Sequence, residues 1–154
     1  MKNTIDIAIL AAGKGTRLGV DTPKALVPVN ARPMILYLIE SVKNATDKSP
    51  IIIASPSNVD SLKDALKDYN CQFVVQHEQL GTGHAVQTIF ENDIPLSEHV
   101  LILYADHPLI SPDTINNLIQ KHVDQNSMFT MLVASVPEFS GIYEGYYHDG
   151  RRIQ

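Results

Sequence analysis

The feature that most constrains the fold of this chain is a series of short apolar runs without polar alternation. Each run is rich in β-branched residues, and segments whose apolar residues recur at helical spacing separate most of the runs. The five expected strands are residues 5–11, 51–54, 73–76, 100–104 and 130–136. Strands that are apolar on both faces are typical of a parallel sheet covered by helices. The sequence therefore predicts an α/β fold with a doubly wound, mostly parallel sheet.

The segments between these runs are expected to be helices with identifiable starts. Pro33 can open one helix, a second is expected to be capped near Asn58, and a third spans residues 83–90. Ser111 and Asp113 can cap a fourth. In a sheet of this kind ligands bind beyond the C-terminal ends of the strands. Functional residues are therefore expected in residues 11–17, 54–57, 76–84 and 104–108.

Length and charge limit the classes of function. The 154 residues suffice for one domain, and a net charge of −5 argues against bulk nucleic-acid binding while permitting a small anionic ligand. No apolar run is long enough to cross a membrane, so no membrane partner is expected. Cys71 is the single cysteine, and the start of the sequence carries no signal-peptide cleavage region. We therefore expect a cytoplasmic protein, and give Cys71 no role.

The first expected strand runs directly into a loop with two glycines and two cations, in the stretch ILAAGKGTRL at residues 9–18. A P-loop needs a longer loop that ends in Lys followed by Ser or Thr, whereas Lys14 lies between the glycines. The spacing of Gly13, Gly15 and Gly19 is one residue too long for a dinucleotide site. The second strand also ends in ASPS, without the carboxylate such a site expects. The spacing excludes a P-loop and disfavours a nicotinamide-dependent dehydrogenase.

What remains is a glycine loop that carries its own positive charge. Gly13 and Gly15 allow backbone N–H groups to approach an anion closely. Lys14 and Arg17 add charge, and Arg17 can bind a phosphate through two parallel hydrogen bonds. Lys24 is a third cation within reach of the same space. This loop is expected to bind phosphate, in preference to a solvated turn with unrelated surface charges.

Two further loops at strand ends carry polar residues. Asp106 follows the run VLILYA, where a carboxylate can hold Mg²⁺ together with nucleotide phosphates or serve only as a turn residue. In the segment QHEQLGTGHA, Gln76 and Gln79 can pair with the edge of a base, and Gly81 and Gly83 permit close backbone approach. The alternative for this segment is a glycine-rich connector. The six histidines show no metal-ligand spacing.

Three stretches, LAAGKGTRL with a following Pro-Lys, QLGTGHA and LYADHPLI, occur in this order along the chain. Together they resemble the sugar-phosphate nucleotidyltransferases, and most closely the uridyltransferase domain of the bacterial N-acetylglucosamine-1-phosphate uridyltransferases. The resemblance extends from about residue 5 to about residue 136. It implies a Rossmann-like fold and a Mg²⁺-dependent transfer from UTP to N-acetylglucosamine 1-phosphate, giving UDP-N-acetylglucosamine and pyrophosphate.

The resemblance also implies roles for residues that match the family's motifs. Leu10, Ala12 and Gly13 would line the uracil site, and Gln76 and Gly81 would read the base with Thr82 beside it. Lys14, Gly15 and Arg17 would bind the triphosphate. Arg17 and Lys24 would act on the phosphates at the reacting centre, Tyr104 and Ala105 would border the sugar pocket, and Asp106 would ligate Mg²⁺.

The chain also departs from the family's pattern. Ala105 stands where the family usually has Gly, and the family's Gly-Tyr-Gly-Arg stretch has no clear counterpart, although Gly141 or Gly145 could substitute. The family's domain continues well beyond Gln154, with sugar-binding residues and an asparagine that binds a second Mg²⁺. Residues 1–154 are therefore expected to be the N-terminal portion of the domain, without the acetyltransferase domain of the bifunctional enzymes.

Three functional readings stay open on the sequence. The first is the uridyltransferase reaction, and the second is transfer to another sugar phosphate or from another nucleotide. The third is a truncated nucleotide-binding module without catalysis. An unfinished sheet edge favours pairing between copies, so a homo-oligomer is one expected assembly.

Overall fold

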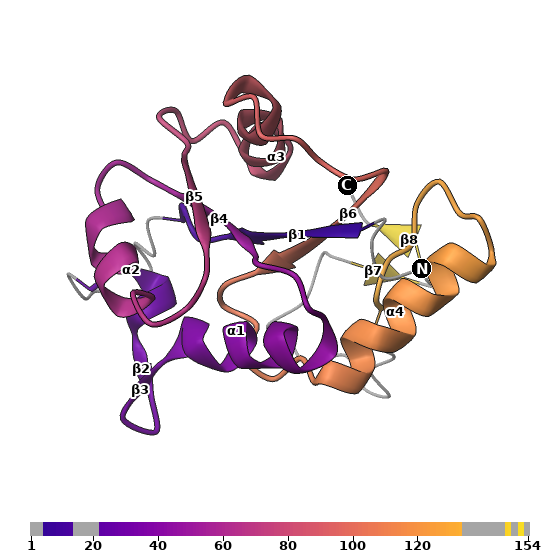
Figure 1. Cartoon of the computed structure of the whole chain (residues 1–154), viewed down its shortest axis with the longest axis horizontal. Coiled ribbons are helices and arrows are strands. Elements are labelled where there is room, and N and C mark those ends of the chain that lie inside the picture. Colours follow the sequence, from indigo (N-terminus) through magenta and orange to yellow (C-terminus); the bar gives the residue numbers. More distant parts are fainter. Residues whose placement is uncertain (1–4, 14–21, 134–146, 149–150, 153–154) are drawn as a thin grey trace.

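A four-stranded parallel sheet forms the centre of the molecule (Figure 1). The computed structural model describes residues 5–13, 22–133, 147–148 and 151–152. The sheet contains β1 (Ile5–Leu10), β4 (Ile51–Ala54), β5 (Gln72–Val75) and β6 (His99–Tyr104), in the order β5-β4-β1-β6. The predicted doubly wound parallel sheet is confirmed, and each of these four strands lies within a residue or so of its predicted position.

In the described part of the chain, four α-helices cover the two faces of this sheet. They are α1 (Met34–Ala45), α2 (Val59–Ala65), α3 (Thr82–Glu91) and α4 (Pro112–Asp124). Figure 1 shows α3 on one face and the other three on the opposite face. A 3-10 helix, η3 (Lys24–Leu26), and a short hairpin of β2 (Pro28–Val29) and β3 (Arg32–Pro33) precede α1. A second short hairpin pairs β7 (Tyr147–His148) with β8 (Arg151–Arg152).

The strand order explains why α3 lies apart from the other helices. From β1 the chain steps outward to β4 and β5 through α1 and α2, and then crosses back through α3 to β6, on the other side of β1. Because such crossovers are right-handed, connections that run in opposite directions must pass over opposite faces. The reversal lies between β1 and β6, and a doubly wound sheet binds ligands beyond the C-terminal ends of the strands at such a reversal.

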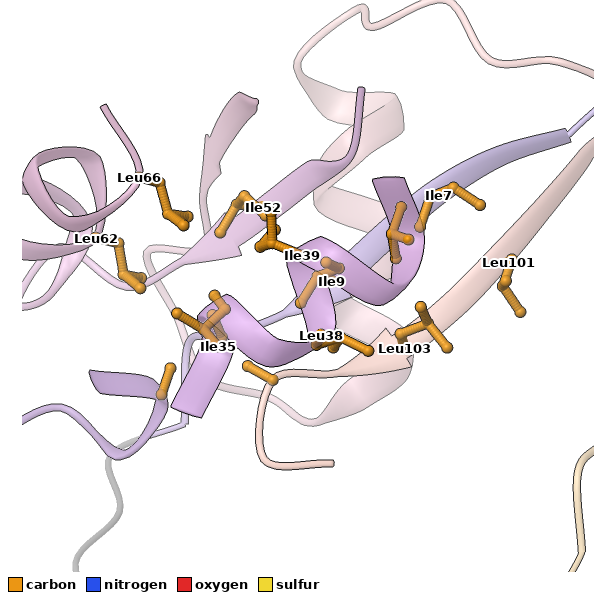
Figure 2. Packing of buried hydrophobic residues seen from close by; sticks show 14 of the residues in the cluster. Ile7, Ile9, Ile35, Leu38, Ile39, Ile52, Leu62, Leu66, Leu101 and Leu103 are labelled. Atoms are coloured by element: carbon orange, nitrogen blue, oxygen red, sulfur yellow. The ribbon is translucent and has the colours of Figure 1, made fainter. Parts of the chain in front are cut away.

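The larger part of the core fills the space between the sheet and α1 (Figure 2). Ile7 and Ile9 of β1 point toward Ile35 and Leu38 of α1, and all four are fully buried. Each such side chain contributes roughly 1.5–3 kcal/mol on burial. A second, smaller cluster joins β1, β4 and β5 to α3 and includes Ile89. These two clusters fix the strands whose ends carry the candidate site.

The strand β6 is less buried than its apolar sequence predicts. Ile102 and Tyr104 are each 41% exposed, while Leu101 and Leu103 are buried in the α1-side cluster. The physical reason is that β6 is at the edge of the sheet and α3 packs over β1, β4 and β5. Only one face of β6 is therefore covered by a helix of the described chain.

Two other expectations differ from the structure. The predicted fifth strand fails at residues 130–133, which pair with no described strand, and residues 134–136 lie outside the described residues. The helix α2 does begin directly after Asn58, but the Asn58 side chain does not cap it. Ser111, by contrast, caps α4 as expected, because its Oγ accepts a hydrogen bond from the Thr114 N–H at 3.2 Å.

A polar cluster anchors the β2–β3 hairpin to α1. The Arg32 guanidinium donates to both carboxylate oxygens of Glu40, and the Tyr37 hydroxyl donates to the Val29 carbonyl at 2.8 Å. Glu40 in turn has its pKa lowered, chiefly by the hydrogen bonds from Arg32. Because the hairpin follows η3 directly, this anchor also holds the segment that carries Lys24 in place.

Candidate active site

Backbone hydrogen bonds continue the sheet by one residue beyond three strands and so fix the start of each loop. The Ala11 N–H donates to the Ile53 carbonyl at 2.8 Å, and the Ala105 N–H donates to the Leu10 carbonyl at 3.1 Å. The Gln76 N–H donates to the Ala54 carbonyl at 2.8 Å. The three loops that the sequence indicates therefore leave the same edge of the sheet from rigid positions.

The glycine loop begins at this edge, where the side chain of a buried asparagine binds the backbone. Asn58 is 5% exposed, its Nδ2 donates to the Ala11 carbonyl at 2.9 Å, and its Oδ1 accepts from the Ser55 N–H at 2.8 Å. Ala12 is buried, and Gly13 is exposed with open space around its Cα. Asn58 therefore holds the start of the glycine loop, a role that the sequence did not indicate because a helix cap and a buried tether show the same local pattern.

The loop that follows β5 reaches across the edge to the glycine loop. Gln79 donates through Nε2 to the Ala12 carbonyl at 2.7 Å, so it tethers the two loops. Gln76 is 3% exposed and donates through Nε2 to the Gly81 carbonyl at 3.2 Å. Gly81 has φ +106°, a conformation that favours glycine, and it is the N-cap residue directly before α3.

On the other side of β1, a lysine and an aspartate form an ion pair. Nζ of Lys24 donates to Oδ2 of Asp106, and the two side chains are 41% and 31% exposed. Nε2 of His107 lies 3.8 Å from Oδ1 of the same carboxylate. The sequence expectation that Lys24 reaches the space of the glycine loop and Asp106 is thus consistent with this geometry, although 82 positions separate the two residues.

The charge of Asp106 is stabilised by this environment. Partial burial raises the pKa of the Asp106 carboxyl, but the hydrogen bond and positive charge of Lys24 outweigh it, so the pKa lies below its ordinary value. Asp106 is therefore ionised at neutral pH. A carboxylate of this kind is the type of oxygen ligand that Mg²⁺ accepts.

The described residues contain no group of three or more His, Cys, Asp or Glu side chains that could hold a metal ion. Mg²⁺ does not require such a group, because it commonly binds one or two carboxylates and completes its shell with water and substrate phosphates. Asp106 has the required donor type and its side chain is partly exposed.

Most of the predicted site residues meet at this one edge of the sheet. They are Leu10, Ala12, Gly13, Lys24, Gln76, Gly81, Thr82, Tyr104, Ala105 and Asp106. Lys14, Gly15 and Arg17 lie outside the described residues. The methyl group of Ala105 belongs to the buried cluster on the α1 side, so this departure from the family's glycine is accommodated inside the core.

Two further observations concern the Cys71 thiol and the character of the helices. Burial raises the pKa of Cys71 to about 11, so the thiol is protonated at neutral pH and is not an activated nucleophile. In the part of the chain that the structure describes, no helix combines the length and the apolar character that a membrane crossing requires.

Solved structures share this fold at low sequence identity. One is Rv0371C of Mycobacterium tuberculosis H37Rv in complex with manganese, with a TM-score of 0.61 and 18% identity, covering 77% of this chain and 59% of that one. Another is CMP:2-keto-3-deoxy-manno-octonic acid synthetase complexed with CTP, with a TM-score of 0.62 and 18% identity, covering 81% of this chain and 49% of that one. At such identities the likeness shows the fold.

Sequence comparison places the chain in a family. The bifunctional protein GlmU of Desulfotalea psychrophila (strain LSv54 / DSM 12343) is 40% identical over 136 residues, covering 88% of this chain and 40% of that protein. The bifunctional protein GlmU of Psychrobacter sp. (strain PRwf-1) is 37% identical over 133 residues, covering 86% of this chain and 29% of that protein. The chain thus spans well under half of the length of these relatives. A family model for the MobA-like NTP transferase domain matches residues 7–139, and the chain therefore belongs to that family of nucleotidyltransferases.

Proposed function

We propose that the chain transfers a uridylyl group from UTP to N-acetylglucosamine 1-phosphate, with Mg²⁺ as cofactor, and so forms UDP-N-acetylglucosamine and pyrophosphate. The observation that carries this proposal is the Lys24–Asp106 ion pair at the reversal of the sheet, with the buried Gln76 beyond another strand of the same edge. Membership of a nucleotidyltransferase family supports the reaction class. The choice of UTP and of the sugar rests on the resemblance of the loop QLGTGHA to the uridyltransferases.

The arrangement of the loops supports one orientation of the nucleotide. Gln76 and Gly81 belong to the loop after β5, and Gln79 ties this loop to Ala12. Lys24 and Asp106 lie on the β6 side of the same edge. We therefore place the base between Ala12 and the loop after β5, and the reacting phosphates toward Asp106.

In the proposed reaction a phosphate oxygen of the sugar phosphate attacks the α-phosphorus of UTP, and pyrophosphate leaves from the opposite side. No general base is required, because the attacking phosphate oxygen is already ionised. Lys24 would turn from Asp106 to the phosphates and stabilise the negative charge of the transition state. Arg17, predicted from the sequence, would bind the triphosphate through two parallel hydrogen bonds.

Asp106 is the residue proposed to hold Mg²⁺. When bound there, Mg²⁺ would neutralise phosphate charge and orient the reacting groups. The manganese complex of one solved neighbour and the CTP complex of another support a divalent metal and a nucleotide as ligands of this fold. The reducing cytoplasm, which suits a chain with one cysteine and a nucleotide substrate, is the proposed location.

The experiment that tests this function is a pyrophosphate-release assay with Mg²⁺, UTP and N-acetylglucosamine 1-phosphate. In parallel reactions, CTP or GTP replaces UTP, and glucose 1-phosphate replaces N-acetylglucosamine 1-phosphate. We expect Asp106→Asn to reduce turnover by about a hundredfold or more, because it removes the charge that holds the metal and balances Lys24. Asp113→Asn is the matched control, because Asp113 is exposed in the first turn of α4 and lies apart from the ion pair.

The outcomes of this assay distinguish the three functional hypotheses given by the sequence. Release of pyrophosphate with UTP and N-acetylglucosamine 1-phosphate, lost in Asp106→Asn and kept in Asp113→Asn, supports the proposal. Faster release with another nucleotide or sugar phosphate assigns the chain to a different reaction of the same family. Binding of UTP without any release would contradict the proposed catalysis and leave a nucleotide-binding module.

A further inference from the structure

The side-chain amide of Gln76 contacts two groups that fix its orientation. Its Nε2 lies 3.2 Å from the Gly81 carbonyl oxygen and 3.0 Å from Nδ1 of His84. A carbonyl oxygen can only accept hydrogen bonds, so the group of Gln76 that faces it must be the NH₂. The same NH₂ faces His84, and Nδ1 of His84 is therefore the acceptor. It follows that the ring proton of neutral His84 is on Nε2.

Both amide protons of Gln76 are thus used inside the protein, and the oxygen Oε1 is left over. No residue in the described part of the chain donates a hydrogen bond to Oε1. Among the described residues, no buried side-chain nitrogen or oxygen lacks a partner, so Oε1 must be reached by solvent. Gln76 as a whole is only 3% exposed. A buried side chain therefore presents one hydrogen-bond acceptor at the edge of the sheet where ligands bind.

The environment of His84 suits this arrangement. His84 is half-buried in the first turn of α3 and lines a cavity of about 290 Å³, whose walls also include Glu78 and Glu91. Ionised carboxylates only accept hydrogen bonds, so those that share this cavity with His84 are compatible with a ring nitrogen that carries a proton. The acceptor nitrogen Nδ1 faces Gln76 on its other side.

From this geometry we propose that His84 determines base specificity by positioning Gln76 so that only an acceptor faces N3 of the bound pyrimidine. This inference rests on the proposed function and deepens it. The N3–H of uracil donates to Oε1, whereas N3 of cytosine is itself an acceptor and is repelled by Oε1. His84 contacts no substrate in this arrangement and acts through Gln76.

Removal of the Nδ1 acceptor should allow the Gln76 amide to rotate more freely. In His84→Phe one amide proton of Gln76 loses its partner, and only the Gly81 carbonyl still opposes rotation of the amide. A rotated amide would present its NH₂ to the base, and this NH₂ can donate a hydrogen bond to N3 of cytosine. Asparagine is the conservative replacement, because its Oδ1 can accept the same hydrogen bond from Gln76.

The test measures the dissociation constants of UTP and CTP by calorimetry on the whole chain, with Mg²⁺ present. We expect the wild type to prefer UTP by about tenfold or more, and His84→Phe to narrow this ratio by about fivefold. His84→Asn should keep the wild-type ratio. His77→Phe is the matched control, because His77 also lines the cavity but makes no hydrogen bond to Gln76 that the structure describes.

A second measurement requires no variant. Nitrogen-15 chemical shifts of the histidine rings, assigned by comparison with His84→Asn, distinguish the two neutral tautomers. We expect His84 to be protonated on Nε2 and unprotonated on Nδ1. A proton on Nδ1 would overturn the inference whether or not the phenylalanine variant folds.

The binding results separate this inference from the proposed function. If the wild type prefers UTP and His84→Phe keeps the full ratio, His84 does not set specificity and the proposed function stands. If both His84 variants lose the ratio, an acceptor at this position is not the cause, and the inference is wrong. If the wild type shows no preference for UTP, the proposed substrate is wrong as well.

Discussion

Replacement of Asn58 by alanine should destabilise the chain more than any other change of a single polar side chain near the site. The Asn58 amide makes hydrogen bonds of 2.8 and 2.9 Å to two backbone groups and is 5% exposed. Its loss removes two hydrogen bonds and leaves the Ala11 carbonyl and the Ser55 N–H without these partners. At roughly 1–3 kcal/mol for each of the two buried groups left unpaired, the expected loss is about 2–6 kcal/mol.

The measurement is the free energy of unfolding from urea titrations followed by circular dichroism. A loss of this size is a large part of the roughly 5–15 kcal/mol that stabilises a typical domain. Asn70→Ala is the control, because Asn70 makes a hydrogen bond of 2.6 Å to Ser49 in an exposed position. We expect Asn70→Ala to cost less than about 0.5 kcal/mol. Equal effects of the two substitutions would refute the view that Asn58 is a buried tether of the glycine loop.

Three further predictions concern the core and the titratable groups. Burial raises the pKa of Asp6, but hydrogen bonds from Ser97 and Lys48 and the charge of Lys48 outweigh burial, so this pKa lies below its ordinary value. The ionised Asp6 carboxylate therefore contributes to the free energy of unfolding above about pH 4, and this contribution is lost as the pH falls through the folded-state pKa. Asp6→Asn should make the free energy of unfolding fall less steeply at acid pH, and an unchanged acid dependence would contradict this. Leu38→Ala should cost about 2–5 kcal/mol in thermal unfolding, because Leu38 is fully buried, while Leu80→Ala at a 70% exposed position should cost little. Cys71 should react slowly with a disulfide reagent at pH 8 and rapidly once urea unfolds the chain, because burial holds its pKa at about 11; rapid reaction of the folded chain would argue against that burial.

The sheet could be predicted from the sequence because its strands are apolar without alternation. The run at residues 51–54 forms β4 with all four residues buried, as a strand covered on both faces must be. The expected strand at residues 130–136 shows the limit of such reasoning. An apolar β-branched run becomes a strand only when a neighbouring strand pairs with it, and residues 130–133 have no such neighbour among the described strands.

The loops of the site could be located from the sequence, but the partners of their side chains could not. The sequence indicated that Gln79 can pair with a base, but not that its amide nitrogen binds the Ala12 carbonyl. The choice between these roles depends on how far the loop after β5 bends toward β1, which local residue spacing does not encode. The same holds for Asn58 and for the contact between Gln76 and His84.

The spatial neighbourhood of Lys24 and Asp106 is the part of the site that the sequence predicted best. The strand order places the end of β6 next to the end of β1, and the hairpin anchored by Arg32 and Glu40 holds the segment of Lys24. A carboxylate at a strand end and a lysine after the glycine loop were therefore sufficient to indicate that the two side chains lie close together. Which phosphate each residue contacts remains a prediction.

The central claim is that this edge of the sheet binds a nucleoside triphosphate together with a metal held by Asp106. Calorimetric titration of UTP, with Mg²⁺ or with EDTA, tests it without requiring turnover. We predict that Mg²⁺ tightens UTP binding to the wild type and to Asp113→Asn by about tenfold or more, and that this gain falls below about threefold in Asp106→Asn. Failure of the wild type to bind UTP, or a full Mg²⁺ gain in Asp106→Asn, would contradict the claim.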